Sequence, residues 1–197
     1  MPSSRIAHAA LVAAIALPPV VLSAQAPKTY TAADVAFIQG MIHHHAQAIL
    51  IAGWAKSHGA SASVQQLCDR IVVSQTDEIT IFQRWLAQRG QTTVDLAATH
   101  AMMPSMDPHS VMPGMLTDQQ LAALDAARGD QFDQLFLQDM IQHHQGAITM
   151  VNGLFAVGSG EDETVYKFAT DIYADQTTEI ARMQKMLASI MFGTPPA

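Results

Sequence analysis

Two segments of the chain share one sequence pattern, and this duplication constrains the fold more than any other feature. FIQGMIHHHAQAI covers Phe37 to Ile49 and FLQDMIQHHQGAI covers Phe136 to Ile148, with Phe, Gln, Met, Ile, two His, Ala and Ile at identical positions. A second matching pair follows downstream, at Ile71 to Leu86 and Ile172 to Leu187. A period of about a hundred residues is too long for a solenoid and indicates a duplicated helical hairpin.

Helix start and stop signals agree with this interpretation. Capping residues stand before the expected helices, and glycines follow the helix ends. The capping pairs are Thr31 with Asp34, Asp130 with Asp133, and Ser159 with Asp162. A composition rich in Ala, Gln, Met and Leu also favours helices over strands. The sequence therefore predicts an all-α fold, a four-helix bundle built from two duplicated helical hairpins, with a short additional helix from Asp118 to Ala127.

We expect one domain preceded by a signal peptide. Residues 1–26 contain Arg5, a short apolar run interrupted by prolines, and a group of small residues, which is typical of a signal peptide. A membrane anchor is the alternative, but the run is short for a transmembrane helix. The mature chain, residues 27–197, is then periplasmic or secreted, without stable membrane insertion. It divides into repeat one (31–90), a Met/His-rich loop (91–116) and repeat two (117–193).

Charge and cysteine content narrow the function further. A net charge of -7, with only ten Lys and Arg, argues against a nucleic-acid partner, because phosphate binding needs clustered basic residues. The single cysteine, Cys68, cannot form an internal disulfide. It falls in phase with apolar neighbours, so we expect a small buried core residue.

Histidine and methionine lie on the inward stripes of the duplicated helices. In the first copy Met41 and His44 fall on the inner seam and His45 on its flank. The matching residues of the second copy are Met140, His143 and His144. Met and His four residues apart share a helix face and can chelate one ion, whereas His44 and His143 would have to meet across the bundle.

Two glutamates, Glu78 and Glu179, occupy inward positions on the other two helices. Because a buried carboxylate needs a partner, we expect each to accept a hydrogen bond from an imidazole. That contact would set the tautomer that presents a lone pair to a metal. The alternative is a polar core layer, in which these side chains only fix the helix register.

The loop between the repeats carries the most specific chemical signal. The residues Met103, Met106, His109, Met112 and Met115 follow one another at a constant interval of three. Thioether sulfur is a soft, neutral donor that selects Cu(I) over hard ions. The alternative is that these methionines fill gaps where the loop packs on the bundle. Against it, exposed methionine is readily oxidised, so a dense cluster without a purpose is a liability.

Together these motifs resemble a bacterial extracytoplasmic family, known as a domain of unknown function, that includes CopM-like copper-binding proteins. The motifs are D-x-x-F-I-x-x-M-I-x-H-H at Asp34 to His45, its second copy at Asp133 to His144, MPGML at Met112 to Leu116, and Q-x-x-E-I at Gln75 and Gln176. The resemblance runs from about Thr31 to Leu187. It implies a ferritin-like four-helix bundle, copper binding in the periplasm, and these Met and His residues as ligands.

The sequence predicts an extracytoplasmic copper-binding protein, a Cu(I) carrier or buffer, that uses Met and His ligands. Cu(II) and zinc remain open as the ion, and a copper-delivery protein or a second copy of the chain as the partner. We expect no enzyme, because a ferritin-like di-metal oxidase needs Glu-x-x-His, and the third residue after Glu78 is Ile81 and after Glu179 is Arg182. A helical binding or structural module is the other alternative.

Overall fold

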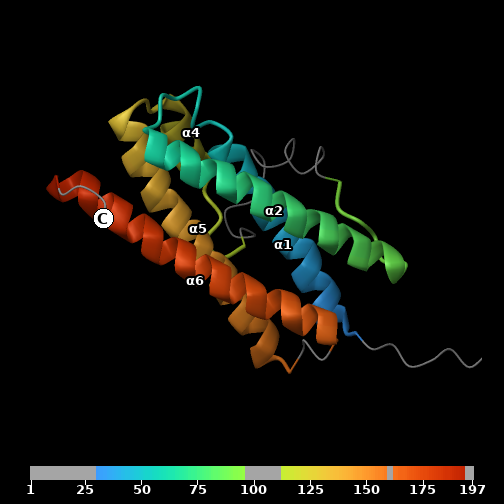
Figure 1. The fold of residues 1–197 in the computed structure, drawn as a ribbon. Coiled ribbons are helices and arrows are strands. Elements are labelled where there is room, and N and C mark those ends of the chain that lie inside the picture. Colours follow the sequence, from blue (N-terminus) through green and yellow to red (C-terminus); the bar gives the residue numbers. More distant parts are fainter. Residues whose placement is uncertain (1–29, 96–111, 159–161, 194–197) are drawn as a thin grey trace, which may run out of the picture.

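The computed structural model describes residues 30–95, 112–158 and 162–193. These residues form helices and no strands (Figure 1). The helices are α1 (Ala32–Ala52), α2 (Ala62–Gln88), α4 (Asp118–Ala126), α5 (Asp130–Ala156) and α6 (Glu163–Phe192). The predicted signal peptide, residues 1–26, lies outside the described residues. No helix in the described part of the chain combines the length and the apolar character that crossing a membrane requires.

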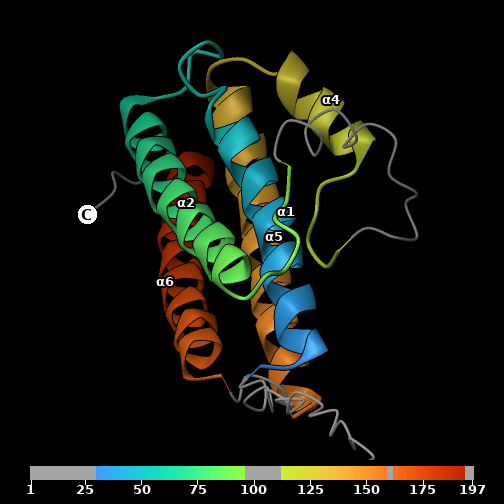
Figure 2. The same cartoon turned by 90° about the vertical axis from the view of Figure 1, so that its right-hand side faces the viewer.

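The long helices pair as two hairpins, α1 with α2 and α5 with α6, and the hairpins join where α1 packs against α5. Figure 2 shows α1 and α5 side by side in the middle of the bundle, with α4 against α5 on the outside. Helices α2 and α6 make few contacts with each other. The predicted all-α fold, with four long helices from two hairpins, is confirmed.

Side-chain caps fix most of the helix starts. Thr31 and Asp34 form a capping box at α1, Thr117 and Gln120 form one at α4, and the Asp162 carboxylate accepts backbone N–H bonds at α6. The predicted pairing of Asp130 with Asp133 at α5 is wrong.

The N-cap residue of α5 is instead Gly129, which has a φ of 56° and offers no side-chain cap. Glycine adopts this left-handed conformation without a steric penalty. The Gly129 N–H donates to the carbonyl of His58 over 2.8 Å, which ties the start of α5 to the segment after α1. The Asp133 carboxylate accepts the N–H of Ser61, the N-cap residue of α2. Asp133 therefore links the two hairpins.

Apolar side chains fill the interior in two clusters, one around Phe132, Phe136 and Leu67, the other around Phe82, Ile38 and Val151. Cys68 belongs to the first cluster and is almost completely buried, as predicted. Burial raises the pKa of its thiol to about 12. The Cys68 side chain is therefore a neutral core residue at physiological pH.

Candidate metal centre

Two histidines at equivalent positions of the repeat meet where α1 packs on α5. The rings of His44 and His143 have their centroids 3.8 Å apart, with an angle of 41° between the planes. Both side chains are fully buried. The predicted meeting across the bundle is therefore observed, and it follows from the packing of two copies of one sequence pattern.

The buried imidazoles leave ring nitrogens without partners. His44 Nε2 lies 3.0 Å from the carbonyl oxygen of Pro113. Because a carbonyl only accepts, this nitrogen carries the hydrogen, and Nδ1 keeps a lone pair that meets no hydrogen-bond donor. Neither ring nitrogen of His143 has a hydrogen-bond partner of good geometry. Since an unpaired buried polar group costs about 1–3 kcal/mol, this arrangement is suited to a ligand that takes up the free lone pairs.

Both central imidazoles are neutral at physiological pH. Burial, reinforced by the neighbouring His45, lowers the pKa of His44 from 6.5 to about 3. Burial and the nearby histidines lower the pKa of His143 well below its ordinary value. A neutral imidazole is the form that binds a metal, so these two side chains are in the ligating state without first losing a proton.

The flanking histidines each contact a glutamate of the neighbouring helix. His144 Nε2 donates to Glu179 Oε2 over 2.7 Å. His45 Nε2 lies 2.6 Å from Glu78 Oε2, although the angle is poorer than in the His144 pair. Because two lone pairs would repel at these distances, each Nε2 carries a hydrogen, which leaves Nδ1 with the lone pair. Both Nδ1 atoms are buried and have no hydrogen-bond partner. The geometry is that of a carboxylate orienting a histidine ligand.

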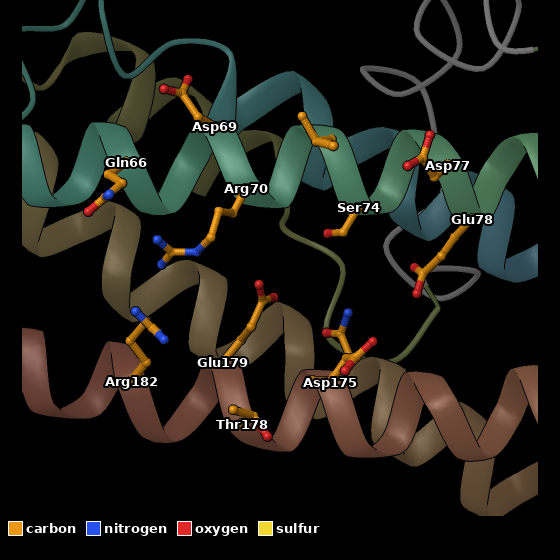
Figure 3. A pocket seen from close by; sticks show the side chains of 12 residues that line it. Gln66, Asp69, Arg70, Ser74, Asp77, Glu78, Asp175, Thr178, Glu179 and Arg182 are labelled. Atoms are coloured by element: carbon orange, nitrogen blue, oxygen red, sulfur yellow. The ribbon is translucent and has the colours of Figure 1, made fainter.

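The two glutamates are less buried than the helix pattern predicts. The side chains of Glu78 and Glu179 keep 21% and 20% of their surface exposed. Periodicity places them inside a closed bundle, but α2 and α6 make few contacts, so the carboxylates border a space open to solvent (Figure 3). Each carboxylate therefore contacts a buried imidazole on one side and solvent on the other.

The helix methionines are surrounded by apolar side chains. Met41 and Met140 are completely buried, each within a hydrophobic cluster. Within residues 30–95, 112–158 and 162–193, no three side chains among His, Cys, Asp and Glu converge closely enough to hold a metal ion. A metal at the histidine pair would thus need donors of another type, or a rearrangement of the side chains.

The end of the connecting loop docks beside the histidine pair. The Met112 sulfur lies next to Gly40, one helical turn before His44, at 3.4 Å from where a Cβ of Gly40 would stand, and the Met150 methyl lies at 3.3 Å from the same point. Met115 is buried. The other predicted loop ligands, Met103, Met106 and His109, lie outside the described residues.

Glycine allows this segment to reach the helices. A Cβ on Gly146 of α5 would stand 1.9 Å from the Pro113 carbonyl oxygen, the same oxygen that accepts from His44. On the other side, the Gln47 side chain donates to the carbonyl of Leu116 and accepts its N–H. Sequence reasoning did not name Gly146, Gly40 or Met150 as site residues, although the helical pattern places Met150 on the inner seam with His143. The only signal for the two glycines is that the repeat copies differ at these positions.

Comparison with known proteins identifies relatives of this fold. A family model, the domain of unknown function DUF305, matches residues 34–187. A DUF305 protein from Streptomyces coelicolor is 26% identical, with a TM-score of 0.68, over 81% of this chain and 94% of that one. A DUF305 fragment from Deinococcus radiodurans is 29% identical, with a TM-score of 0.68, over 81% and 97%.

CopM in its Cu(II)-bound form is 30% identical to the chain, with a TM-score of 0.64, over 79% of this chain and 96% of that one. CopM has also been solved in Cu(I)-bound and Ag-bound forms, at TM-scores of 0.58 and 0.57. No match was found among curated proteins. Since the family model spans most of the bundle and both copies of the repeat, the chain belongs to the DUF305 family.

Proposed function

We propose that this protein binds copper outside the cytoplasm and acts as a Cu(I) carrier or buffer. The observation that carries the proposal is the pair of fully buried, neutral imidazoles, His44 and His143, in which His44 Nδ1 and both ring nitrogens of His143 lack a hydrogen-bond partner of good geometry. CopM, a relative at 28–30% identity, has been solved with Cu(I) and Cu(II). The proposed compartment rests on residues 1–26, which have the pattern of a signal peptide, and on the description of the Streptomyces coelicolor relative as secreted.

Imidazole and thioether donors together suit Cu(I). In the proposed site, His44 and His143 supply nitrogen, and Met112 and Met150, which both lie beside Gly40, are the nearest candidates for sulfur. Neutral donors of this kind bind Cu(I) without a proton having to leave. Two further nitrogen ligands would be His45 and His144, which Glu78 and Glu179 orient. On the connecting loop, copper would be bound by Met103, Met106, His109 and Met115.

The test is titration of the reduced mature protein with Cu(I) against a chromophoric chelator, on the wild type and on H44L combined with H143L. We expect the double variant to lose the tight component, and a melting curve checks that it is folded, because it removes unpaired ring nitrogens but also the hydrogen bond from His44 to Pro113. His58→Leu is the matched control, since His58 is also buried but contacts Asp125 instead of the pair. Equal Cu(I) affinity in all three proteins would refute the proposed site.

A helical module without metal is the second candidate. It is favoured by Met41 and Met140, whose sulfurs are packed among apolar side chains. If this candidate holds, the melting temperature does not change when Cu(I), Cu(II) or Zn(II) is added, because only a ligand that binds the native state raises stability. A rise with Cu(I) that is absent in the H44L and H143L double variant supports the copper proposal instead.

A further inference from the structure

The end of the connecting segment forms a tight turn beside the histidine pair. The N–H of Met115 donates to the carbonyl of Met112 over 3.1 Å. Pro113 and Gly114 occupy the two central positions, and Gly114 has a φ of 77°. Proline followed by a residue with positive φ is the pattern of a type II turn, which fixes the direction of the central peptide. The carbonyl of that peptide is the one that accepts from His44 Nε2 over 3.0 Å.

The turn lies in direct contact with α5 on one side. A Cβ on Gly114 would stand 2.6 Å from the Cα of Gly146 and 2.7 Å from the carbonyl oxygen of Gln142. Backbone therefore packs on backbone, and no side chain on this side of the turn can hold it by a hydrogen bond. The position of the turn depends on what binds it from α1.

A single amide of α1 holds the turn from that side. The Gln47 side chain donates to the carbonyl of Leu116 over 3.1 Å and accepts its N–H over 2.8 Å. Gln47 is only 2% exposed and Leu116 only 4%. Without the amide, a buried backbone N–H and a buried carbonyl would lose these bonds, and the segment would have to move to reach water.

The other described end of the connecting segment is held by the same chemistry. The Gln83 side chain of α2 donates to the carbonyl of Val94 over 2.6 Å and accepts its N–H over 3.1 Å. The two glutamines thus make the same pair of bonds to one backbone residue each. Only Leu116 is three residues from Pro113, so only the Gln47 amide acts on the acceptor of His44.

We propose that Gln47 is the positioning residue of the candidate metal centre. It holds the turn so that Pro113 keeps the hydrogen on His44 Nε2 and leaves the Nδ1 lone pair for the ion. The same amide keeps the Met112 sulfur beside Gly40, one helical turn before His44. Gln47 is not itself a ligand. Its effect on metal binding rests on the proposed copper function, whereas its effect on the His44 ring does not.

The first experiment follows the Nε2–H group of His44 by NMR in the metal-free mature protein with isotope-labelled histidine. Loss of the signal in H44L identifies it. In the wild type we expect one Nε2–H signal that exchanges slowly with water. Gln47→Leu should speed the exchange by at least about tenfold and place part of the hydrogen on Nδ1, because the acceptor moves away. Gln83→Leu is the matched control and should change the exchange by less than about twofold, although it also loses two hydrogen bonds.

Gly114→Ala displaces the turn by a second route and leaves Gln47 intact. Alanine is strained at a φ of 77°, and its methyl group would collide with Gly146. We expect the same change in the His44 signal as in Gln47→Leu. Melting curves verify that all variants are folded, and Gly114→Ala provides the result if Gln47→Leu does not fold.

Cu(I) titration of the same proteins measures the consequence for metal binding. Gln47→Leu should weaken Cu(I) binding by about 10–100-fold, as loss of a group that orients a ligand does, and Gln83→Leu by less than about twofold. An unchanged His44 signal in both Gln47→Leu and Gly114→Ala overturns the assignment of Gln47. An equal change in Gln83→Leu overturns it too, because general loosening would then explain the effect. A wild type that binds no Cu(I) refutes the proposed function instead, and the NMR result still decides the role of Gln47.

Discussion

The two halves of the molecule agree at the histidines and differ where the connecting segment touches them. Equivalent positions hold Gln47 in α1 and Gly146 in α5. Gln47 makes two hydrogen bonds to Leu116, whereas the missing side chain of Gly146 leaves room for Pro113. The conserved part of the repeat thus builds the imidazole pair, and the divergent part fixes the segment that covers it.

This difference makes the two central histidines chemically unequal. The Pro113 carbonyl accepts from His44 Nε2, whereas His143 has only a contact of poorer geometry with the backbone of His44. A duplicated pattern alone would give two identical rings. The docked segment decides which nitrogen of His44 carries the hydrogen, and so which atom can bind an ion.

The largest predicted effect is the loss of folding stability at low pH, which should come from His44 and His143. Above pH 6.5 His44 and His143 are neutral in both the folded and the unfolded metal-free chain, so they contribute no pH dependence. Below pH 6.5 the unfolded chain takes up protons that the folded chain refuses until the pH reaches the lowered pKa values, about 3 for His44. The free energy of unfolding should therefore fall by about 1.4 kcal/mol per pH unit per imidazole between pH 6 and 4.

Urea unfolding at several pH values measures this effect. The H44L and H143L double variant should lose most of the decline, because it lacks the two groups that protonate on unfolding. An unchanged pH slope in that variant would show that other groups cause the acid sensitivity.

The next largest effect should come from Gly146→Ala. Its methyl group would collide with the Pro113 backbone, so either the segment or α5 must shift, at a cost of about 1–3 kcal/mol. Gly153→Ala in the same helix is the control, because nothing lies within 4 Å of its Cβ, and alanine there should be neutral or stabilising. Thermal unfolding compares the two, and equal stabilities would mean that the close packing of Pro113 on α5 is not needed.

The pattern of the sequence predicts the helices, their pairing and the inward direction of His44, His45, His143 and His144, because periodicity and duplication act locally. It does not predict the docking of Pro113 on Gly146, since a contact between a loop and a distant helix leaves no periodic signal. The depth of Glu78 and Glu179 was overestimated for a related reason. A helical stripe tells which way a side chain faces, but how closely α2 approaches α6 depends on the whole bundle.

Substituting each glutamate should test whether the two equivalent contacts contribute the same stability in both repeats. Glu78→Ala and Glu179→Ala each leave a buried imidazole N–H without its acceptor, which costs about 1–2 kcal/mol once partial exposure of the carboxylates is considered. We expect the two losses to agree closely, because the contacts are equivalent in the repeat. Urea unfolding at pH 7.5 measures both. A much smaller loss for Glu78→Ala would show that the poorer angle of its contact with His45 makes the halves unequal here too.

The smallest predicted effect on stability concerns the starts of α1 and α5, which have different N-caps although their sequences are equivalent in the repeat. Thr31 and Asp130 are equivalent in sequence, but Thr31 caps α1, whereas Asp130 is an exposed first-turn residue after the glycine cap of α5. Thr31→Ala should therefore cost about 1 kcal/mol and Asp130→Ala only about 0.3–0.5 kcal/mol, through the lost interaction with the helix dipole. Thermal unfolding in low salt resolves the difference, and raising the salt should shrink only the Asp130 effect. If both variants lose the same stability and respond equally to salt, Asp130 acts as a cap after all, and the two helices start alike.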